Sequence, residues 1–295
     1  MSGFWSSYII ILTVLNILFC FWMIRFTSKK SKYESGQGEV TGHVWDEDLE
    51  EYNNPLPRWW LGLFYITIVF SLIYFVVYPG MGNYQGMFNW SQTDQYNQEI
   101  KQADATYGPI FAKYAATSIP DLAKDATAVK VGQRLFLNYC STCHGSNAKG
   151  AAGFPNLTDN SWLYGGTAEA IKTSIMNGRN GVMPPMGLAL GNNIDNVVDY
   201  VQSLNGRTVD PQSVTAGKAK FGIFCAACHG ANAKGNPALG APDLTDNTWL
   251  YGGSPGVIKM TIDKGRNGHM PPHKNFLGED KVHVLTAYIY SLGNR

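Results

Sequence analysis

The sequence has few charged residues and no excess of either sign. Asp, Glu, Lys and Arg make up 15% of the 295 residues, and 23 basic against 22 acidic residues leave a formal net charge of +1. Average soluble proteins carry about 25% charged residues, so we expect part of this chain to lie away from water. Nucleic-acid binding requires a basic face, and the balanced charge argues against that class. Hydrophobic residues at 45% exclude extensive disorder.

The missing charges are concentrated in two apolar runs. Residues 7–26 contain one charge, Arg25, and residues 59–78 contain none. About 20 residues, each rising about 1.5 Å, cross a hydrocarbon core of about 30 Å, so both runs are predicted to be transmembrane helices in a lipid membrane. A buried core helix rarely continues this long without charge. A cleaved signal peptide has a basic start and a small-residue cleavage site, and the first run shows neither.

The loops predict the orientation of these spans. The basic residues of the N-terminal region lie between or beside the two runs: Arg25, Lys29, Lys30, Lys32 and Arg58. The positive-inside rule then places residues 27–58 in the cytoplasm and everything after Pro79 on the opposite side. Residues 79–128 are predicted to be a tether, with a helix over 91–116 that Ser91 caps.

The remainder is an internal repeat. Residues 140–166 read CSTCHGSNAKGAAGFPNLTDNSWLYGG, and residues 225–253 read CAACHGANAKGNPALGAPDLTDNTWLYGG. Further on, GRNGVMPPM is repeated as GRNGHMPPH, 87 residues later, and each copy ends in a helical pattern of apolar residues. The predicted organisation is a first span with a short N-terminus (1–26), a cytoplasmic loop (27–58), a second span (59–78), a tether (79–128) and two domains (129–208 and 209–295). Each copy is small for a self-sufficient core, so a group other than side chains is expected to fill it.

Each copy contains the C-x-x-C-H sequence that attaches c-type haem. Two thiols separated by two residues add to the two vinyl groups of one porphyrin, and the next residue supplies an imidazole as the fifth iron ligand. The sequence therefore predicts two haem c groups, held by Cys140 and Cys143 with His144, and by Cys225 and Cys228 with His229. A disulfide framework or a zinc site that combines the two cysteine pairs leaves the repeated histidines and methionines unexplained.

The repeat also selects the sixth ligands. The candidates are Met176, Met183 and Met186 in the first copy and Met260, His269, Met270 and His273 in the second. Only Met183 and Met270 are methionines at equivalent positions, and each is followed by two prolines, which fix φ and hold the chain extended. Methionine opposite histidine raises the potential of haem iron and fills both axial positions, so we predict electron-transfer haems. His273 is a rival ligand for the second haem.

Two questions stay open in the sequence. Each methionine serves the haem of its own copy, or two facing domains exchange these loops, so that Met183 serves the haem at His229 and Met270 the haem at His144. Arg179 and Arg266 are candidates to pair with haem propionates, with solvated surface arginines as the alternative.

Residues 42–60, GHVWDEDLEEYNNPLPRWW, followed by a span and two C-x-x-C-H modules, resemble the CcoP (FixP) subunits of cbb3-type cytochrome c oxidases. The resemblance covers almost the whole chain, although many members of that family have one span. Together with the two spans predicted from hydropathy, it implies a mainly α fold, in which two N-terminal transmembrane helices are followed by two tandem class I cytochrome c domains.

The resemblance also implies a function. The chain would accept electrons from a donor cytochrome c and pass them to a monohaem cytochrome c subunit and then to the haem-copper catalytic subunit, where oxygen is reduced to water. It would lie in a bacterial inner membrane with its haem domains in the periplasm, and no catalytic residue is expected in this chain. The alternatives are a dihaem electron carrier of another respiratory complex, a membrane-anchored dihaem peroxidase, and a non-redox assembly or sensing role.

Overall fold

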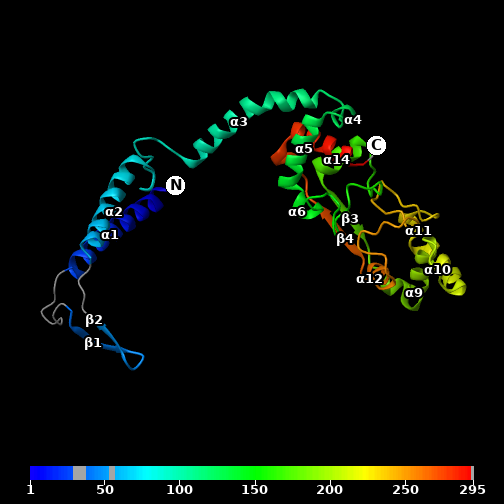
Figure 1. Ribbon diagram of the computed structural model, residues 1–295, viewed down its shortest axis with the longest axis horizontal. Coiled ribbons are helices and arrows are strands. Elements are labelled where there is room, and N and C mark those ends of the chain that lie inside the picture. Colours follow the sequence, from blue (N-terminus) through cyan, green and yellow to red (C-terminus); the bar gives the residue numbers. More distant parts are fainter. Residues whose placement is uncertain (29–37, 53–56, 294–295) are drawn as a thin grey trace. The chain divides into compact units, whose positions relative to one another are not determined.

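The computed structural model describes residues 1–28, 38–52 and 57–293 (Figure 1). By its internal contacts the chain divides into two units, Met1–Asp104 and Ala105–Arg295. The described residues are mainly helical, as the sequence predicts, with two short two-stranded sheets.

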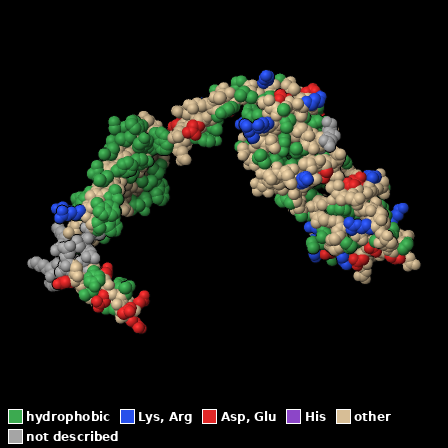
Figure 2. Space-filling model, viewed as in Figure 1, with side chains coloured by type: hydrophobic (Ala, Val, Ile, Leu, Met, Phe, Trp, Pro, Cys, Tyr) green, Lys and Arg blue, Asp and Glu red, His purple; other side chains and the backbone are tan. Residues whose placement is uncertain are grey.

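The first unit contains the two apolar helices, α1 (Gly3–Thr27) and α2 (Arg58–Val77). Both are long and apolar enough to cross a membrane, with mean hydropathies of 2.3 and 2.2, and neither is buried within the protein. Figure 2 shows their apolar side chains covering the visible surface of this pair. A helix that is apolar on all sides with no protein to cover it fits a lipid environment, so these helices suggest membrane anchoring.

Between the two helices lies a hairpin that the sequence analysis did not predict. Strand β1 (Val40–Trp45) pairs antiparallel with β2 (Leu49–Tyr52), and Asp46 and Glu47 turn the chain with positive φ. Acidic side chains gather at this hairpin (Figure 2). The alternation of apolar and polar residues that predicts a half-buried strand is weak here, because almost every side chain of both strands is exposed.

Helix α3 (Gln92–Ala115) follows, close to the predicted bounds, and the Ser91 hydroxyl accepts a hydrogen bond from the Asp94 N–H at 3.0 Å. Within the second unit, the short helix α4 (Ile119–Leu122) and the end of α3 pack against residues of both repeats. The contact is a hydrophobic cluster that includes Leu122 and Val284.

The second unit is built from two equivalent sets of elements. The first repeat contributes α5 (Ala126–Tyr139), α6 (Ser141–His144), α7 (Ala168–Asn177), β3 (Arg179–Met183), α8 (Gly187–Leu190), the 3-10 turn η1 (Gly191–Asn193) and α9 (Ile194–Leu204). The second contributes α10 (Pro211–Phe224), α11 (Ala226–His229), α12 (Pro255–Lys264), β4 (Arg266–Met270), α13 (Lys274–Leu277) and α14 (Glu279–Leu292). Each N-terminal helix begins at an aspartate whose carboxylate accepts backbone N–H groups, Asp125 for α5 and Asp210 for α10.

The two repeats exchange their C-terminal thirds. Helix α14 of the second repeat packs on α5 and α7 of the first, and α9 of the first repeat packs on α10 and α12 of the second. Two hydrophobic cores result, and each contains residues from both repeats. The aromatic pairs Phe136–Tyr288 and Phe221–Tyr200, with ring centroids 5.5 and 5.2 Å apart, lie at equivalent places in the two cores.

Strands β3 and β4 join the exchanged segments. They pair antiparallel, with Gly181 opposite Gly268 at the centre and Met183 opposite Arg266 at one end. Gly181 and Gly268 are equivalent residues of the repeat. The two strands therefore pair symmetrically about this central pair of glycines. This is the arrangement of a two-fold symmetric interface, in which the same patch meets itself.

The close approach of α5 and α14 generates a test of the exchanged packing. A Cβ atom added at Gly132 would lie 2.5 Å from the Tyr288 Cβ, whereas one added at Gly222 in α10 meets nothing within 4 Å. Overpacking of a tight contact costs about 1–3 kcal/mol. We therefore expect Gly132→Ala to lower the free energy of unfolding by that amount in urea denaturation.

Gly222→Ala is the matched control, because a helix-interior alanine in open space is neutral or stabilising by up to about 1 kcal/mol. Equal stabilities for the two variants would contradict the packing of α5 on α14.

Candidate haem sites

The two C-x-x-C-H segments form short helical turns at the ends of the N-terminal helices. In the first, Cys140 is the single residue between the end of α5 at Tyr139 and the start of α6 at Ser141. In the second, Cys225 joins α10 to α11 in the same way. A turn of helix places residues three and four apart on one side, which brings Cys140, Cys143 and His144 together.

All four thiols are free rather than joined in disulfides. The first cysteine of each pair is half-buried and the second is exposed. Burial raises the pKa of the Cys140 thiol to about 11, with a smaller contribution from the neighbouring Cys143. Burial, with a smaller contribution from Cys228, raises the pKa of the Cys225 thiol to about 11 as well. The disulfide alternative is therefore wrong for these described cysteines.

The two histidines are the buried polar residues of these turns, with exposed fractions of 9% for His144 and 8% for His229. The Nδ1 atom of His144 is 3.0 Å from the Pro155 carbonyl oxygen, and that of His229 is 3.3 Å from the Pro242 carbonyl oxygen. An Nδ1–H that donates to a carbonyl fixes the tautomer and leaves Nε2 free to bind a metal. Desolvation lowers the pKa of both imidazoles, which favours the neutral form that a metal needs.

Pro155 and Pro242, whose carbonyl groups orient these imidazoles, were not predicted as site residues from the sequence. Their signal was present, since the two prolines occupy equivalent places in the repeated stretch, each two residues before a Leu-Thr-Asp segment. A carbonyl acceptor is a backbone group, however, and the sequence alone does not show which carbonyl a ring nitrogen will meet.

The structure places the two candidate methionines in exchanged positions. Met270 packs against the core that contains Phe136 and Cys140, and Met183 packs against the core that contains Phe221 and Cys225. Of the other candidates, Met176 lies against the first core, Met186 lies against the second, and Met260 is 53% exposed. His273, expected as a rival ligand near the second haem, is buried beside the first core instead.

Glycines of the repeat hold the methionine segments close to the middle helices. Gly178 ends α7 with φ +69°, and a Cβ there would overlap the Met270 carbonyl; Gly265 ends α12 with φ +71° and lies in the same way against Met183. A positive φ and a backbone contact both require glycine. Each methionine segment is thereby tied to the middle helix of the other repeat.

Arg179 and Arg266 have partners within the protein. Each guanidinium lies over the ring of a repeated tyrosine, Arg179 over Tyr164 at 4.6 Å and Arg266 over Tyr251 at 4.3 Å. The Arg179 Nε–H also donates to the Ser174 hydroxyl at 2.9 Å. Both arginines are partly exposed, so the predicted role at a propionate and the alternative of surface arginines both stay predictions.

The donor set fits haem c. Each site offers two free thiols three residues apart, a buried imidazole with one nitrogen left for iron, and a methionine against the same core. Among the described residues, the Tyr164 hydroxyl and the Trp249 Nε1–H are buried without a hydrogen-bond partner, and such orphan groups are expected to meet a polar group of the ligand. No cluster of three or more His, Cys, Asp or Glu residues that could hold a metal ion by itself occurs in the described part of the chain.

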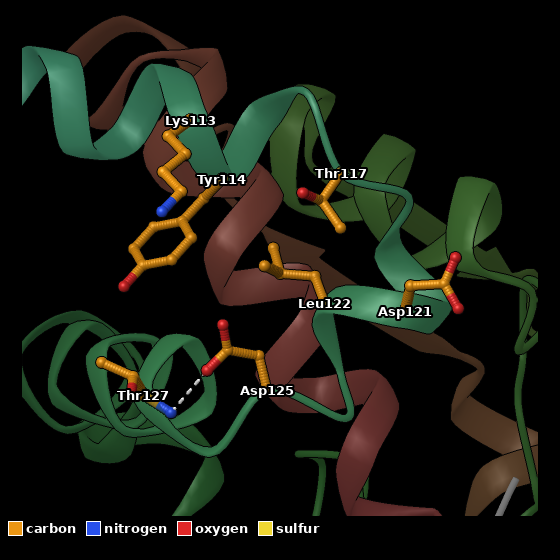
Figure 3. A pocket seen from close by; sticks show the side chains of 7 residues that line it. All are labelled: Lys113, Tyr114, Thr117, Asp121, Leu122, Asp125 and Thr127. Carbon is orange, nitrogen blue, oxygen red and sulfur yellow. Dashed lines mark hydrogen bonds between the residues drawn. The ribbon is translucent and has the colours of Figure 1, made fainter.

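A pocket of about 430 Å³ lies elsewhere in the second unit, between the end of α3 and the start of α5 (Figure 3). Its polar groups serve local structure, since Asp125 caps α5 through the Thr127 N–H and Asp121 pairs with Lys124. It contains none of the predicted site residues.

These features define a class of protein: a chain with two cytochrome c domains, which implies haem c binding, and two apolar helices ahead of them. Comparison with known families gives the particular family. Residues 37–85 match the N-terminal domain of cytochrome oxidase-cbb3, FixP, and residues 127–201 and 212–289 match cytochrome c oxidase, cbb3-type, subunit III. The chain belongs to the CcoP/FixP family of cbb3-type cytochrome c oxidase subunits.

Curated relatives agree over nearly the full length. The chain is 44% identical to the cbb3-type oxidase subunit CcoP of Rubrivivax gelatinosus, across 98% of this chain and 94% of the relative. It is 39% identical to subunit FixP of Bradyrhizobium sp. (strain ORS 278), across 89% and 98%, and 36% identical to CcoP of Azospirillum brasilense, across 90% and 99%. The chain is thus a cytochrome c electron-transfer subunit and part of a cbb3-type oxidase complex.

The glycine that ties Met270 to α7 generates a prediction. Gly178→Ala meets both an unfavourable φ and the Met270 carbonyl, whereas Gly191→Ala meets an unfavourable φ, +51°, with nothing within 4 Å. Strain at a positive φ costs about 1–2 kcal/mol, and the contact adds about 1–3 kcal/mol. We expect Gly178→Ala to lower the melting temperature further than Gly191→Ala in calorimetry.

The difference between the two variants isolates the contact, because both carry the same kind of backbone strain. A Gly178→Ala protein as stable as Gly191→Ala would show that the Met270 segment does not press on the end of α7.

Proposed function

We propose that this chain is the dihaem electron-entry subunit of its oxidase. It accepts electrons from a donor cytochrome c and passes them to a monohaem cytochrome c subunit, from which they reach the haem-copper subunit that reduces oxygen to water. One observation carries the proposal: two equivalent turns each present two free thiols and a buried, oriented imidazole to a core that a repeated methionine completes.

Two haem c groups are held covalently in this proposal. Cys140 and Cys143 form the thioethers of the first haem, and Cys225 and Cys228 those of the second. His144 and His229 supply the proximal imidazoles, oriented by their hydrogen bonds to the Pro155 and Pro242 carbonyl groups. Bound haem would supply the one-electron redox chemistry at both sites.

The distal ligands are exchanged between the repeats. Met270 would be the sixth ligand of the first haem and Met183 that of the second, because each methionine packs against the same core as the first cysteine of the other repeat. The β3–β4 ladder and the glycine contacts at the ends of α7 and α12 keep the two segments in these places. With a histidine and a methionine to hold the iron at each site, neither haem would leave a position for oxygen or peroxide to bind.

The proposed location is a bacterial inner membrane. α1 and α2 span it, residues 27–58 lie in the cytoplasm, and the tether (79–128) and the haem domains (129–208 and 209–295) lie in the periplasm. The distribution of Lys and Arg supports this orientation. Haem-bearing domains on the periplasmic side are accessible to a soluble donor cytochrome.

Purification of the tagged chain from solubilised membranes tests the function. We expect haem b, copper and a monohaem cytochrome c to accompany it, and oxygen uptake by the complex when a reduced donor cytochrome c is added. A chain that carries haem c but purifies without haem b or copper would favour a carrier of another respiratory complex.

A single-haem variant tests the exchange of ligands. Cys140→Ala/Cys143→Ala leaves the second haem as the only chromophore of the chain. Adding Met183→Ala is expected to abolish the red charge-transfer band of a methionine–iron(III) bond, because Met183 is the ligand of that haem.

The matched variant adds Met270→Ala to the same single-haem chain and is expected to leave the band in place. The reverse pattern would show that each methionine serves the haem of its own repeat.

A further inference from the structure

His273 breaks the equivalence of the two haem sites. Its counterpart in the first repeat is Met186, and both lie three residues beyond a candidate iron ligand. The backbone of each is held in the same way: the His273 N–H donates to the Ile175 carbonyl at 3.0 Å, and the Met186 N–H donates to the Ile262 carbonyl at 2.8 Å. The two sites therefore carry an imidazole and a thioether at the same structural position.

The His273 side chain is buried, with an exposed fraction of 9%. Its Nδ1 atom has no hydrogen-bond partner among the residues that the structure describes. Its ring lies 5.3 Å from that of Phe276, at an interplanar angle of 48°. A buried polar nitrogen without a partner costs about 1–3 kcal/mol, and this cost is recovered if the nitrogen meets a bound group.

The surroundings of His273 belong to the first site. Ile175 and Leu277, which flank it through backbone hydrogen bonds, are members of the core against which Met270 and Cys140 pack. The ring of Phe276, which His273 contacts, lies 5.5 Å from the ring of Tyr139, the residue before Cys140. The imidazole thus lies near the turn that carries Cys140 and His144.

We propose that His273 is a reserve axial ligand of the first haem. When the bond between iron and the Met270 sulfur opens, an imidazole nitrogen of His273 binds the iron in its place. One coordination bond breaks and one forms, and no electron or co-reactant is needed. The inference rests on the proposed function, since it requires the first haem at Cys140 and Cys143 and Met270 as its ligand.

The two sites then respond differently to the loss of methionine. At the first haem, imidazole replaces thioether and the iron stays six-coordinate and low-spin, at a lower potential because methionine is the ligand that raises it. At the second haem, the position equivalent to His273 holds Met186, which has no imidazole to offer.

The experiment uses the full-length, haem-loaded chain. Met270→Ala is expected to convert one haem from histidine–methionine to bis-histidine coordination, seen by electron paramagnetic resonance and near-infrared magnetic circular dichroism. Met270→Ala/His273→Ala is expected to give a high-spin haem instead. Met183→Ala is the matched control at the other site, and no bis-histidine signal is expected from it.

A second measurement does not depend on the folding of the Met270 variants. As the chain with Met270 present is warmed toward unfolding, the methionine band of the first haem is expected to give way to a bis-histidine spectrum. In His273→Ala it is expected to give way to a high-spin spectrum.

A high-spin haem in Met270→Ala, or a bis-histidine haem that persists in Met270→Ala/His273→Ala, would overturn the reserve-ligand role. Failure of the proposed function is recognised separately, by fewer than two covalent haems in the unaltered chain or by methionine bands that Met270→Ala leaves unchanged. Either result would overturn this inference as well.

Discussion

The packing of one repeat's C-terminal helix on the other repeat's N-terminal helix is the constraint on which the second unit depends. Helix α5 has its partner in α14, and α10 has its partner in α9. Phe136 and Phe221, the large buried residues of the two N-terminal helices, each meet a tyrosine from the other repeat. Because both cores need both repeats, neither repeat buries its apolar residues alone, and the two cores are expected to form and unfold together.

Exchange also explains why the repeated glycines and the short strands occur where they do. The segments that carry Met183 and Met270 leave their own repeat, pair with each other as β3 and β4, and pass beside the middle helix of the opposite repeat. Five-residue strands with an exposed alternate face have little stability alone. Their pairing is set by the cores on either side and in turn holds the two methionine segments at opposite ends of one ladder.

The sequence predicted the elements of this fold better than their partners. The apolar runs, the helix after Ser91 and the repeated motifs have local signals, and the structure has α1, α2, α3 and the two cytochrome c domains where these signals lie. The sequence left open which methionine joins which histidine, because equivalent residues fit equivalent sites in either arrangement. It missed the Pro155 and Pro242 carbonyl acceptors, the β1–β2 hairpin and the β3–β4 pairing, which depend on backbone contacts and long-range packing rather than on side-chain pattern.

The exchange of α14 has a consequence for the order in which the protein is made. Chains emerge from the ribosome with the N-terminus first, and domains generally fold as they appear. Here the first core begins with α5 at Ala126, yet it needs α14, which begins at Glu279 and comes after every element of the second core. The second core begins later, with α10, and its partner helix α9 has already been made by then. The core that is started first is therefore completed last, after every helix of the second core has been made.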